Sequence, residues 1–441
     1  MAKQVIEPLK TFIIVLLLAS SLFLAGKTGV FNELISSVPV LENAGDWIRS
    51  LGRQNSSSIE GSIFLHEAAR PVGIVLTDRD GLHVGAMYDR AAINDLYNRV
   101  SKTLGEALGS ASVPEEVDRR QWEGALGSEG VYFEFSDEIP LTVAARWLGL
   151  EMINVNSHSA KRICIAKSGD RTDMYYISGD KRIFRCRTAA VLSGLAPLMN
   201  SLMQKEVNFA FELGGDFEGL DPNSLIPKNT PEAYVLKSEN LLDNEAARDS
   251  VFSAFRINPG SKNTYKINEG KANEGVVYVE NNATLEIYKN GLIVYDRETD
   301  GRNDIMLPFA QRPADIGDII EAAWEMIGSL REHDSRGDEV IYFTGVSEAA
   351  SVYKVTFDYF VNGKEIINDG HGATVTMKDG RIIKVSAYLK SYRLAGEKTA
   401  MLPARLAAAI AREGTDGSQL CIAYEDNGAD TLVPFWYPKR A

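Results

Sequence analysis

The feature that most constrains this chain is an uncharged, apolar segment close to its amino end. Residues 11–26 read TFIIVLLLASSLFLAG and lie between Lys10 and Lys27. As an α-helix this segment is roughly 24 Å long, somewhat short of the roughly 30 Å hydrocarbon core of a bilayer. Apolar residues on both sides lengthen it, and the Lys27 amine can extend toward the lipid headgroups. We therefore predict a transmembrane anchor over residues 11–31.

A cleaved signal peptide is the alternative interpretation of the same segment. Signal peptidase requires small residues at the first and third positions before the cut. Cleavage after Ala25 would place Phe23 at the third position. Cleavage after Gly26 would place Leu24 there, and a cut after Ser21 leaves a very short apolar region. The sequence therefore favours a retained anchor.

The charges that flank the anchor predict its orientation. Lys3, Lys10 and the free amino group precede the apolar segment, whereas Lys27 follows it alone. Because cytoplasmic flanks are enriched in Lys and Arg, we expect residues 1–10 to form a cytoplasmic tail. The predicted protein crosses the cell membrane once, with its amino terminus in the cytoplasm and its bulk extracytoplasmic.

Two small residues mark one face of the predicted anchor. Ser21 and Ala25 are four residues apart, so they lie one above the other on a helix. Small side chains let two helix backbones approach closely, which predicts a transmembrane helix contact at this pair. The alternative is that such residues are common in any membrane span.

The composition of the 441 residues excludes one class of partner. There are 47 Lys and Arg against 60 Asp and Glu, which gives a formal net charge of −13. Nucleic-acid binding requires clustered basic side chains that neutralise phosphates, so we predict no nucleic-acid partner. With 45% hydrophobic and 24% charged residues, the chain is typical of a globular protein.

The part that follows the anchor is too long for a single core, and we predict an α+β fold of about three mixed domains with mainly antiparallel sheets. The polar run after residue 52 indicates a juxtamembrane linker over residues 32–61. The predicted domains are a first one over 62–205, a middle one over 206–308 and a C-terminal one over 309–441.

Periodicity and turn residues predict the elements inside these domains. Helices are expected over residues 89–108, 114–126, 137–149, 189–203, 314–333 and 403–412, with another from about 243 whose buried face carries Ala246, Val251, Phe252 and Phe255. Tight hairpin turns are expected at Ser178-Gly179-Asp180, Asn290-Gly291, Asn362-Gly363 and Asp379-Gly380. The middle and last segments share one order, a helix followed by antiparallel strands.

The three cysteines allow two interpretations. Cys164 and Cys186 lie in neighbouring predicted strands and could form a disulfide in an oxidising compartment. The favoured interpretation is that they, like Cys421, are small buried side chains.

Sequence motifs typical of enzymes and metal sites provide little evidence for either in this chain. The five histidines are scattered without metal-ligand spacing, so we predict neither a metal site nor a cofactor. Two S-x-x-K matches, Ser178–Lys181 and Ser351–Lys354, are what chance gives in a chain of this length. An acidic run over residues 296–304 resembles a calcium loop, but its twelfth position is Leu307, which indicates a polar turn. We therefore predict no catalytic residues.

Aromatic and proline residues near the segment edges have two interpretations. Exposed rings of this kind can anchor a partner protein, whereas rings that pack inward belong to the core. The residues concerned are Pro308, Phe309, Pro434, Phe435, Trp436, Tyr437 and Pro438.

Several stretches of the chain together resemble the YycH family of membrane-anchored accessory regulators. The similarity is densest in the middle, in residues 255–259 (FRINP), 265–270 (YKINEG), 277–280 (VYVE), 285–288 (LEIY) and 291–295 (GLIVY). Residues 131–140 (VYFEFSDEIP) also resemble the first domain of that family. The last segment, with residues 360–364 (FVNGK) and 379–382 (DGRI), is similar to the related YycI protein as well.

The resemblance implies extracytoplasmic mixed domains without enzyme activity, and two partners: a two-component sensor histidine kinase of a Gram-positive bacterium and a YycI-like membrane protein. The leading hypothesis is thus a non-catalytic regulator that acts through protein–protein and transmembrane helix contacts. A ligand- or cell-wall-binding module without kinase regulation is the alternative. An envelope hydrolase, a third possibility, would need a Ser, a Lys and an acid that converge in a cleft.

Overall fold

The computed structural model describes residues 68–440, apart from residues 151–152, 156–157, 203–204, 272, 281, 299–304, 308–313, 332–336 and 412–415. These residues belong to one compact unit, Leu65–Ala441. The predicted anchor, its contact pair Ser21 and Ala25, and the linker lie outside the described residues. Among the helices that are described, none has both the length and the apolar character needed to cross a membrane.

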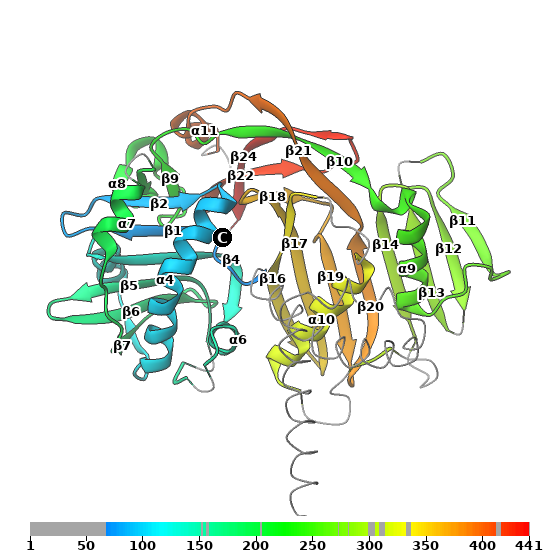
Figure 1. The fold of residues 1–441 in the computed structure, drawn as a ribbon, viewed down its shortest axis with the longest axis horizontal. Helices are drawn as coiled ribbons and strands as arrows, with labels where there is room; N and C mark the ends of the chain where they lie inside the picture. The colour runs from blue at the N-terminus through cyan, green and yellow to red at the C-terminus, as the bar shows by residue number, and fades with distance from the viewer. Residues whose placement is uncertain are drawn as a thin grey trace, which may run out of the picture. The chain divides into compact units, whose positions relative to one another are not determined.

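The first large sheet of the described chain has seven strands in the order β2-β1-β4-β5-β6-β7-β3, and all neighbouring strands are antiparallel. Its strands are β1 (Gly73–Thr77), β2 (His83–Met87), β3 (Glu115–Val117), β4 (Gly130–Pro140), β5 (Ser159–Ser168), β6 (Arg171–Ser178) and β7 (Ile183–Thr188). Helices α4 (Arg90–Ser110) and α6 (Leu141–Trp147) contact one face, and α5 (Arg119–Leu126) contacts β4 and β5 from the other (Figure 1). Both faces of this sheet are therefore buried.

Helix α4 confirms the prediction for residues 89–108. The Asp89 carboxylate caps its start by accepting a hydrogen bond of 3.1 Å from the Ala92 amide. Apolar side chains at three- and four-residue spacing then pack onto the sheet: Ile93, Leu96, Val100, Leu104, Ala107 and Leu108. This buried stripe, more than helix propensity, fixes the helix against the strands.

The second large sheet contains twelve strands within the described residues. The main path runs β11-β12-β13-β14-β20-β19-β17-β18-β22-β24, while β15 pairs with β20 and β16 with β17. Its strands are β11 (Thr264–Ile267), β12 (Gly275–Glu280), β13 (Ala283–Tyr288), β14 (Leu292–Arg297), β15 (Ile305–Met306), β16 (Glu339–Ala349), β17 (Val352–Val361), β18 (Lys364–Ile367), β19 (Ala373–Lys378), β20 (Arg381–Tyr388), β22 (Ser418–Glu425) and β24 (Pro434–Arg440). The pairing of β18 with β22 is parallel. The described fold is thus mixed α+β with mostly antiparallel sheets, as predicted.

The order expected for the middle and last segments is present in this sheet. Helix α9 (Glu245–Phe255) precedes β11–β14, and α10 (Ile316–Leu330) precedes β16–β20. The two helices contact each other, and β14 pairs with β20. One sheet therefore runs through both segments, and the domain boundaries drawn from the sequence stay predictions.

Smaller elements lie beside the two large sheets. A three-stranded sheet has the order β21-β10-β23, and β8 pairs with β9. Strands β10 and β21 run along the upper edge of the view in Figure 1. The remaining elements are α7 (Leu195–Ser201), β8 (Val207–Phe209), α8 (Ala210–Leu213), η2 (Gly215–Phe217), β9 (Leu225–Pro227), β10 (Ala233–Asn240), η3 (Leu241–Asp243), β21 (Lys390–Thr399), α11 (Ala404–Ala411) and β23 (Thr431–Leu432).

The predicted hairpin turns are confirmed by backbone geometry. Asn362 and Gly363 have φ angles of 51° and 74°, and Asp379 and Gly380 have 49° and 69°. Positive φ at both central residues is the type I′ arrangement whose twist matches that of paired strands. Gly291 at the β13–β14 turn likewise has a φ of 86°.

Four element predictions need correction. Glu115 and Glu116 do not begin a helix but form β3, where Glu115 pairs with Arg185 of β7; the helix starts only after Asp118, whose carboxylate caps the Gln121 amide. Residues 137–140 continue β4 and do not start α6.

The other two corrections concern the predicted helices at 189–203 and near 243. Helix α7 is shorter than predicted, because it begins after Gly194, a residue with a φ of 72°. In α9 the buried alanine is Ala247, whereas Ala246 is exposed.

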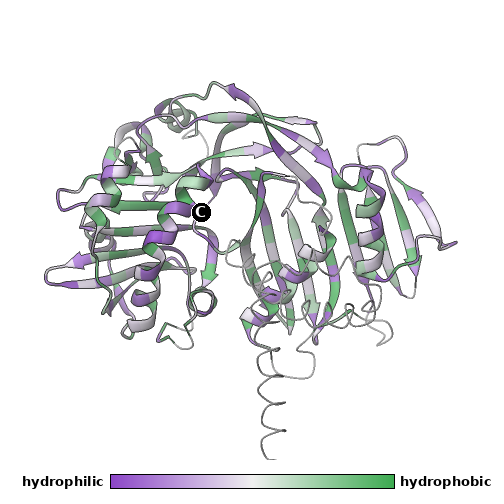
Figure 2. Ribbon diagram, viewed as in Figure 1, coloured by the Kyte–Doolittle hydropathy of each residue, from purple (hydrophilic) through white to green (hydrophobic). Residues whose placement is uncertain are grey.

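One apolar core runs through both large sheets. The Trp147 ring of α6 lies 6.3 Å from the Phe343 ring of β16, edge to face. At the same place the Ser136 hydroxyl donates a 2.7 Å hydrogen bond to the Phe343 carbonyl oxygen. Figure 2 shows hydrophobic residues in the strands of both large sheets. The first sheet is therefore packed against the second, which places β4 near the strands from the end of the chain.

Candidate functional site

The candidate site is built on two irregularities in the first sheet. The pairing of β4 with β5 shifts register between Glu134 and Ile139, and the pairing of β5 with β6 shifts between Ala160 and Arg162. The second shift leaves Lys161 as an extra residue beside Arg162. Bulges of this kind re-aim side chains and are frequent at functional sites.

Next to the bulges lies a chain of buried or half-buried polar side chains, which we call the polar junction: Glu134, Lys161, Arg162, Asp221 and Gln419. Glu134 and Arg162 face each other across β4 and β5, and the Arg162 Nε donates to Glu134 Oε1 at 3.1 Å. The other end of the guanidinium donates to the Asp221 carboxylate. Each of these three charged residues is at least 93% buried, at 3%, 7% and 5% exposure. An unpaired charge at such depth would be strongly destabilising, so the pairing is required.

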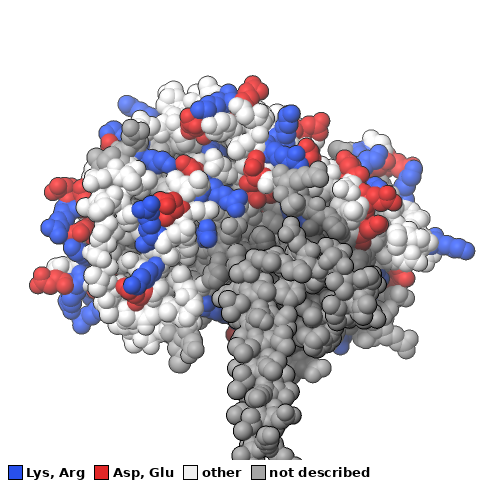
Figure 3. Space-filling view, in the orientation of Figure 1, with Lys and Arg blue, Asp and Glu red and all other residues white. Residues whose placement is uncertain are grey.

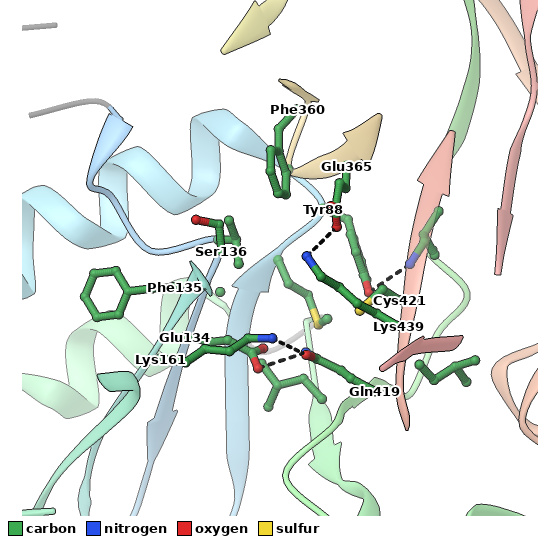
Figure 4. A pocket seen from close by; sticks show the side chains of 17 residues that line it. Tyr88, Glu134, Phe135, Ser136, Lys161, Phe360, Glu365, Gln419, Cys421 and Lys439 are labelled. Atoms are coloured by element: carbon green, nitrogen blue, oxygen red, sulfur yellow. Dashed lines mark hydrogen bonds and ion pairs between the residues drawn. The ribbon is translucent and has the colours of Figure 1, made fainter. Parts of the chain in front are cut away.

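Gln419 of β22 connects this chain to the second sheet. Its amide nitrogen donates to Glu134 Oε1 at 2.8 Å, and its amide oxygen accepts from the Lys161 amine at 2.9 Å. Figure 4 shows these bonds across the space between β4, β5 and the strands from the end of the chain. Residues 285 positions apart in the sequence are thus joined through one side-chain amide.

Lys439 of β24 completes the group of cations around the junction. Its amine forms a 2.8 Å ion pair with Glu365 of β18. Burial opposes the charge of Lys439, but the ion pair outweighs burial and raises its pKa. Burial also opposes the charge of Arg162, whose pKa is nevertheless raised by Tyr132, Glu134 and Asp221. Both side chains therefore stay cationic throughout the physiological pH range.

Lys161 behaves differently. Burial lowers its pKa and the positive charges of Lys439 and Arg162 lower it further, whereas the negative charge of Glu134 acts the other way without reversing the shift. Within the described residues the amine forms no ion pair with a carboxylate, since its partner is the neutral amide of Gln419. The site thus holds one ammonium group whose charge is incompletely balanced.

Two cavities flank the polar junction. The inner one, drawn in Figure 4, has a volume of about 50 Å³ and is bordered by Tyr88, Glu365 and Cys421. Burial raises the pKa of the Cys421 thiol to about 12, so this cysteine is not a reactive thiolate at neutral pH. The outer one, which we call the basic pocket, has a volume of about 430 Å³. That volume lies in the range of small-molecule sites, whereas the inner cavity has space only for a few water molecules.

The basic pocket contains one of the S-x-x-K pairs. Ser178 and Lys181 both line it, beside Glu138 and Asp221. The Ser178 hydroxyl, however, donates to the Asp180 carboxylate and to the Arg182 carbonyl oxygen, which makes it a turn-forming group of the β6–β7 hairpin. These hydrogen bonds are those of a tight turn, so this S-x-x-K pair gives no sign of an activated nucleophile.

The cysteines support the second of their two interpretations. Cys164 and Cys186 are buried free thiols on β5 and β7, with β6 between those strands. They pack into different apolar clusters on opposite faces of the sheet. Two strand spacings, roughly 10 Å, exceed the Cα separation of about 7 Å that a disulfide can span.

Several of the aromatic and proline residues that were predicted to contact a partner line an apolar groove beside α11. Pro434, Phe435, Trp436 and Pro438 line this groove of about 430 Å³, and the Trp436 indole donates to the Leu402 carbonyl oxygen at 2.7 Å. Next to it the exposed apolar side chains gather, at 49 to 67% exposure: Leu402, Leu406, Ile410 and Val433. Pro308 and Phe309 lie outside the described residues.

No metal site emerges from the described residues, in which no three His, Cys, Asp or Glu side chains are grouped for an ion. The calcium-like run lies mostly outside the described part. The Leu307 at its twelfth position is buried at 6% exposure.

Fold and site together define a mixed α+β protein with antiparallel sheets and a charged contact between its first and last parts. Among solved structures the chain is similar to the crystal structure of YycH from Bacillus subtilis. The TM-score is 0.53 at 14% sequence identity, over 84% of this chain and 96% of that one. At this identity the likeness shows the fold, which is YycH-like. No family model matches the chain, and no curated protein sequence does.

Sequence reasoning missed the polar junction altogether. Alternation in strand 131–135 places Glu134 on the face opposite Val131 and Phe133, which the sequence alone predicts to be exposed. The structure buries both faces of this strand, and nothing in the sequence names Arg162 or Gln419 as the partner of Glu134.

Proposed function

We propose that this chain is a membrane-anchored extracytoplasmic protein that modulates a two-component sensor histidine kinase without catalysing a reaction. The observation that carries the proposal is the YycH-like fold, which extends over most of both chains. The apolar segment at residues 11–31 supports the anchor and the single-pass topology, with the amino terminus in the cytoplasm.

Two kinds of contact are available for such a regulator. One is the helix face that carries Ser21 and Ala25, where small side chains allow close packing against helices of the kinase or of a YycI-like membrane protein. The other is the exposed apolar surface around α11, since clustered exposed apolar side chains are typical of protein contact sites.

The direct test is association within the membrane. The full chain with Ser21→Leu and Ala25→Leu should co-purify with the kinase from membranes at a fraction of the level of the unchanged chain, with reduced control of the kinase's reporter output. A matched control with Ile13→Leu and Val15→Leu keeps the segment apolar and should leave both measurements unchanged. Equal co-purification and equal reporter output for the two double variants would contradict the helix contact.

A second function is favoured by a specific observation. The basic pocket is large enough for a small molecule and is lined by convergent polar groups, which suits an extracytoplasmic ligand-binding module. Binding and regulation are compatible in one protein, because the basic pocket and the predicted anchor are different parts of the chain.

A further inference from the structure

The charge balance of the basic pocket is the reverse of that of the whole chain. Its basic lining residues outnumber its acidic ones by six to three, whereas in the whole chain 47 basic residues stand against 60 acidic ones. The six basic residues are Arg119, Lys161, Arg162, Lys181, Lys439 and Arg440. On the face drawn in Figure 3, by contrast, side chains of both signs are interspersed.

The three acidic residues of the pocket already accept hydrogen bonds within the protein. Asp221 accepts from Arg162 and from the Asn223 amide groups. Glu138 accepts from the Ser159 hydroxyl at 2.9 Å, and Asp137 from the Glu138 backbone amide at 2.8 Å. Of the three, Asp221 has its charge paired with Arg162 inside the polar junction.

Three of the six cations of the pocket are held in place from behind, and Arg119 is paired with Glu123. Glu365 orients Lys439, and Glu134 with Asp221 orients Arg162. The Gln419 amide oxygen accepts a hydrogen bond from Lys161, and its amide nitrogen donates one to Glu134, so both side chains are oriented. Because these positions are set without a ligand, little side-chain entropy is lost when an anion binds.

An anion would also relieve the repulsion within this group. Lys161 lies in a partly buried position beside Arg162 and Lys439, where the effective dielectric constant is lower than in water. Its hydrogen-bond partner Gln419 is neutral, and the nearby Glu134 carboxylate offsets that repulsion only in part. A negative group between these cations would stabilise the ammonium form of Lys161, while Arg440 at the exposed end of β24 offers a second positive position.

We propose that the basic pocket binds an anionic ligand that carries at least two phosphate or carboxylate groups. The inference rests on the ligand-binding function and not on regulation of a kinase. Trp122 in the wall of the pocket keeps its indole N–H engaged with Asn223 at 2.7 Å, so an anion would be bound by the cations and not by this donor. The ligand would join Lys161 and Arg162 of the first sheet to Lys439 and Arg440 of β24.

The test is calorimetric titration of the full-length chain with inorganic tripolyphosphate and, separately, with citrate. At least one probe should bind saturably at one site, more weakly as salt is added. Binding of tripolyphosphate alone assigns a phosphate-bearing ligand, binding of citrate alone a carboxylate-bearing one, and binding of both the shared charge pattern. Absence of saturable binding for both probes would overturn the proposal, whatever the kinase measurements show.

Substitutions of charged residues test whether the probe binds in the basic pocket. Lys161→Gln with Arg440→Gln should weaken the bound probe's affinity by tenfold or more, about 1.4 kcal/mol. Lys161→Arg, which keeps the charge, should restore most of the loss that Lys161→Gln alone causes. The matched control Lys266→Gln removes a charge from the β11 strand and should change affinity less than twofold. An equal loss in Lys266→Gln would show non-specific attraction and overturn the proposal. Urea unfolding of each variant establishes that the protein titrated is folded.

Discussion

Two junctions in this molecule are built in different ways. The halves of the second sheet are joined by backbone hydrogen bonds between β14 and β20 and by the contact of α9 with α10. The first sheet meets the end of the chain partly through charged and polar side chains: Glu134, Arg162, Asp221, Lys161 and Gln419. Because salt and charged ligands act on charges, we expect the second junction, which we call the charged junction, to respond to them more than the first.

The largest loss of stability is expected in the apolar core where α9 packs on β14, the strand that pairs with β20. Phe255 of α9 is 1% exposed, and its ring stacks on Tyr295 of β14 at 4.3 Å. Phe255→Ala should lower the free energy of unfolding by about 3–5 kcal/mol, because it removes buried surface and leaves a cavity. Urea unfolding measures the loss.

A matched variant distinguishes this effect from loss of an aromatic residue in general. Tyr265 of β11 is 55% exposed, so Tyr265→Ala should stay within about 0.5 kcal/mol of the unchanged protein. Similar losses in Phe255→Ala and Tyr265→Ala would refute the packing of α9 on β14 described above.

The polar junction should show a smaller but clear loss. Glu134→Ala removes the carboxylate that accepts from both Arg162 and Gln419, while Arg162 keeps Asp221. We expect a loss of about 2–3 kcal/mol in the free energy of unfolding, since one buried charge is left partly unbalanced. The control Glu116→Ala removes an exposed carboxylate of β3 and should cost about 0.5 kcal/mol or less. A cost for Glu134→Ala no larger than that control would mean that the junction contributes no stability.

The smallest expected effect depends on pH. His371 Nδ1 lies 3.0 Å from the Asp358 carboxylate, and this hydrogen bond raises the pKa of His371 although burial opposes it. The stabilisation is fully present below the ordinary histidine pKa of about 6.5 and is lost as pH rises through the raised value. Burial acts to raise the pKa of Asp358, but the His371 hydrogen bond lowers it overall. The stabilisation that this lowered pKa brings is lost only in acid, so it is constant between pH 6 and 8.

Urea unfolding at pH 6 and pH 8 tests this pair. Between pH 6 and pH 8 the free energy of unfolding of the unchanged protein should fall, relative to that of His371→Gln, by less than about 1 kcal/mol. The effect is small because the imidazole is 41% exposed and solvent weakens the pair. The opposite sign, a gain of stability toward pH 8 relative to His371→Gln, would contradict the assignment.

Local chemistry made part of the fold predictable. The turns at Asn362-Gly363 and Asp379-Gly380 followed from the positive φ that those residues tolerate, and α4 followed from its buried stripe. Glu115 was misplaced because acidic residues after a proline suit a helix start, whereas its pairing with Arg185 depends on a strand 70 residues away. Local patterns do not contain such partners.

The site was less predictable than the fold for the same reason. Lys161 and Gln419 are 258 positions apart, and their contact depends on a register shift that no turn residue in the sequence predicts. The predicted contact pair, Ser21 and Ala25, lies outside the described residues and stays a prediction.

Hydrogen exchange of the full-length chain, with and without tripolyphosphate, most directly tests whether the charged junction is the responsive one. Binding at the basic pocket should slow amide exchange in β5 and β24, which carry its cations, and in β4 and β22, which hold Glu134 and Gln419. Exchange in β14 and β20 should stay the same. Uniform protection of all these strands, or protection confined to β14 and β20, would contradict the account.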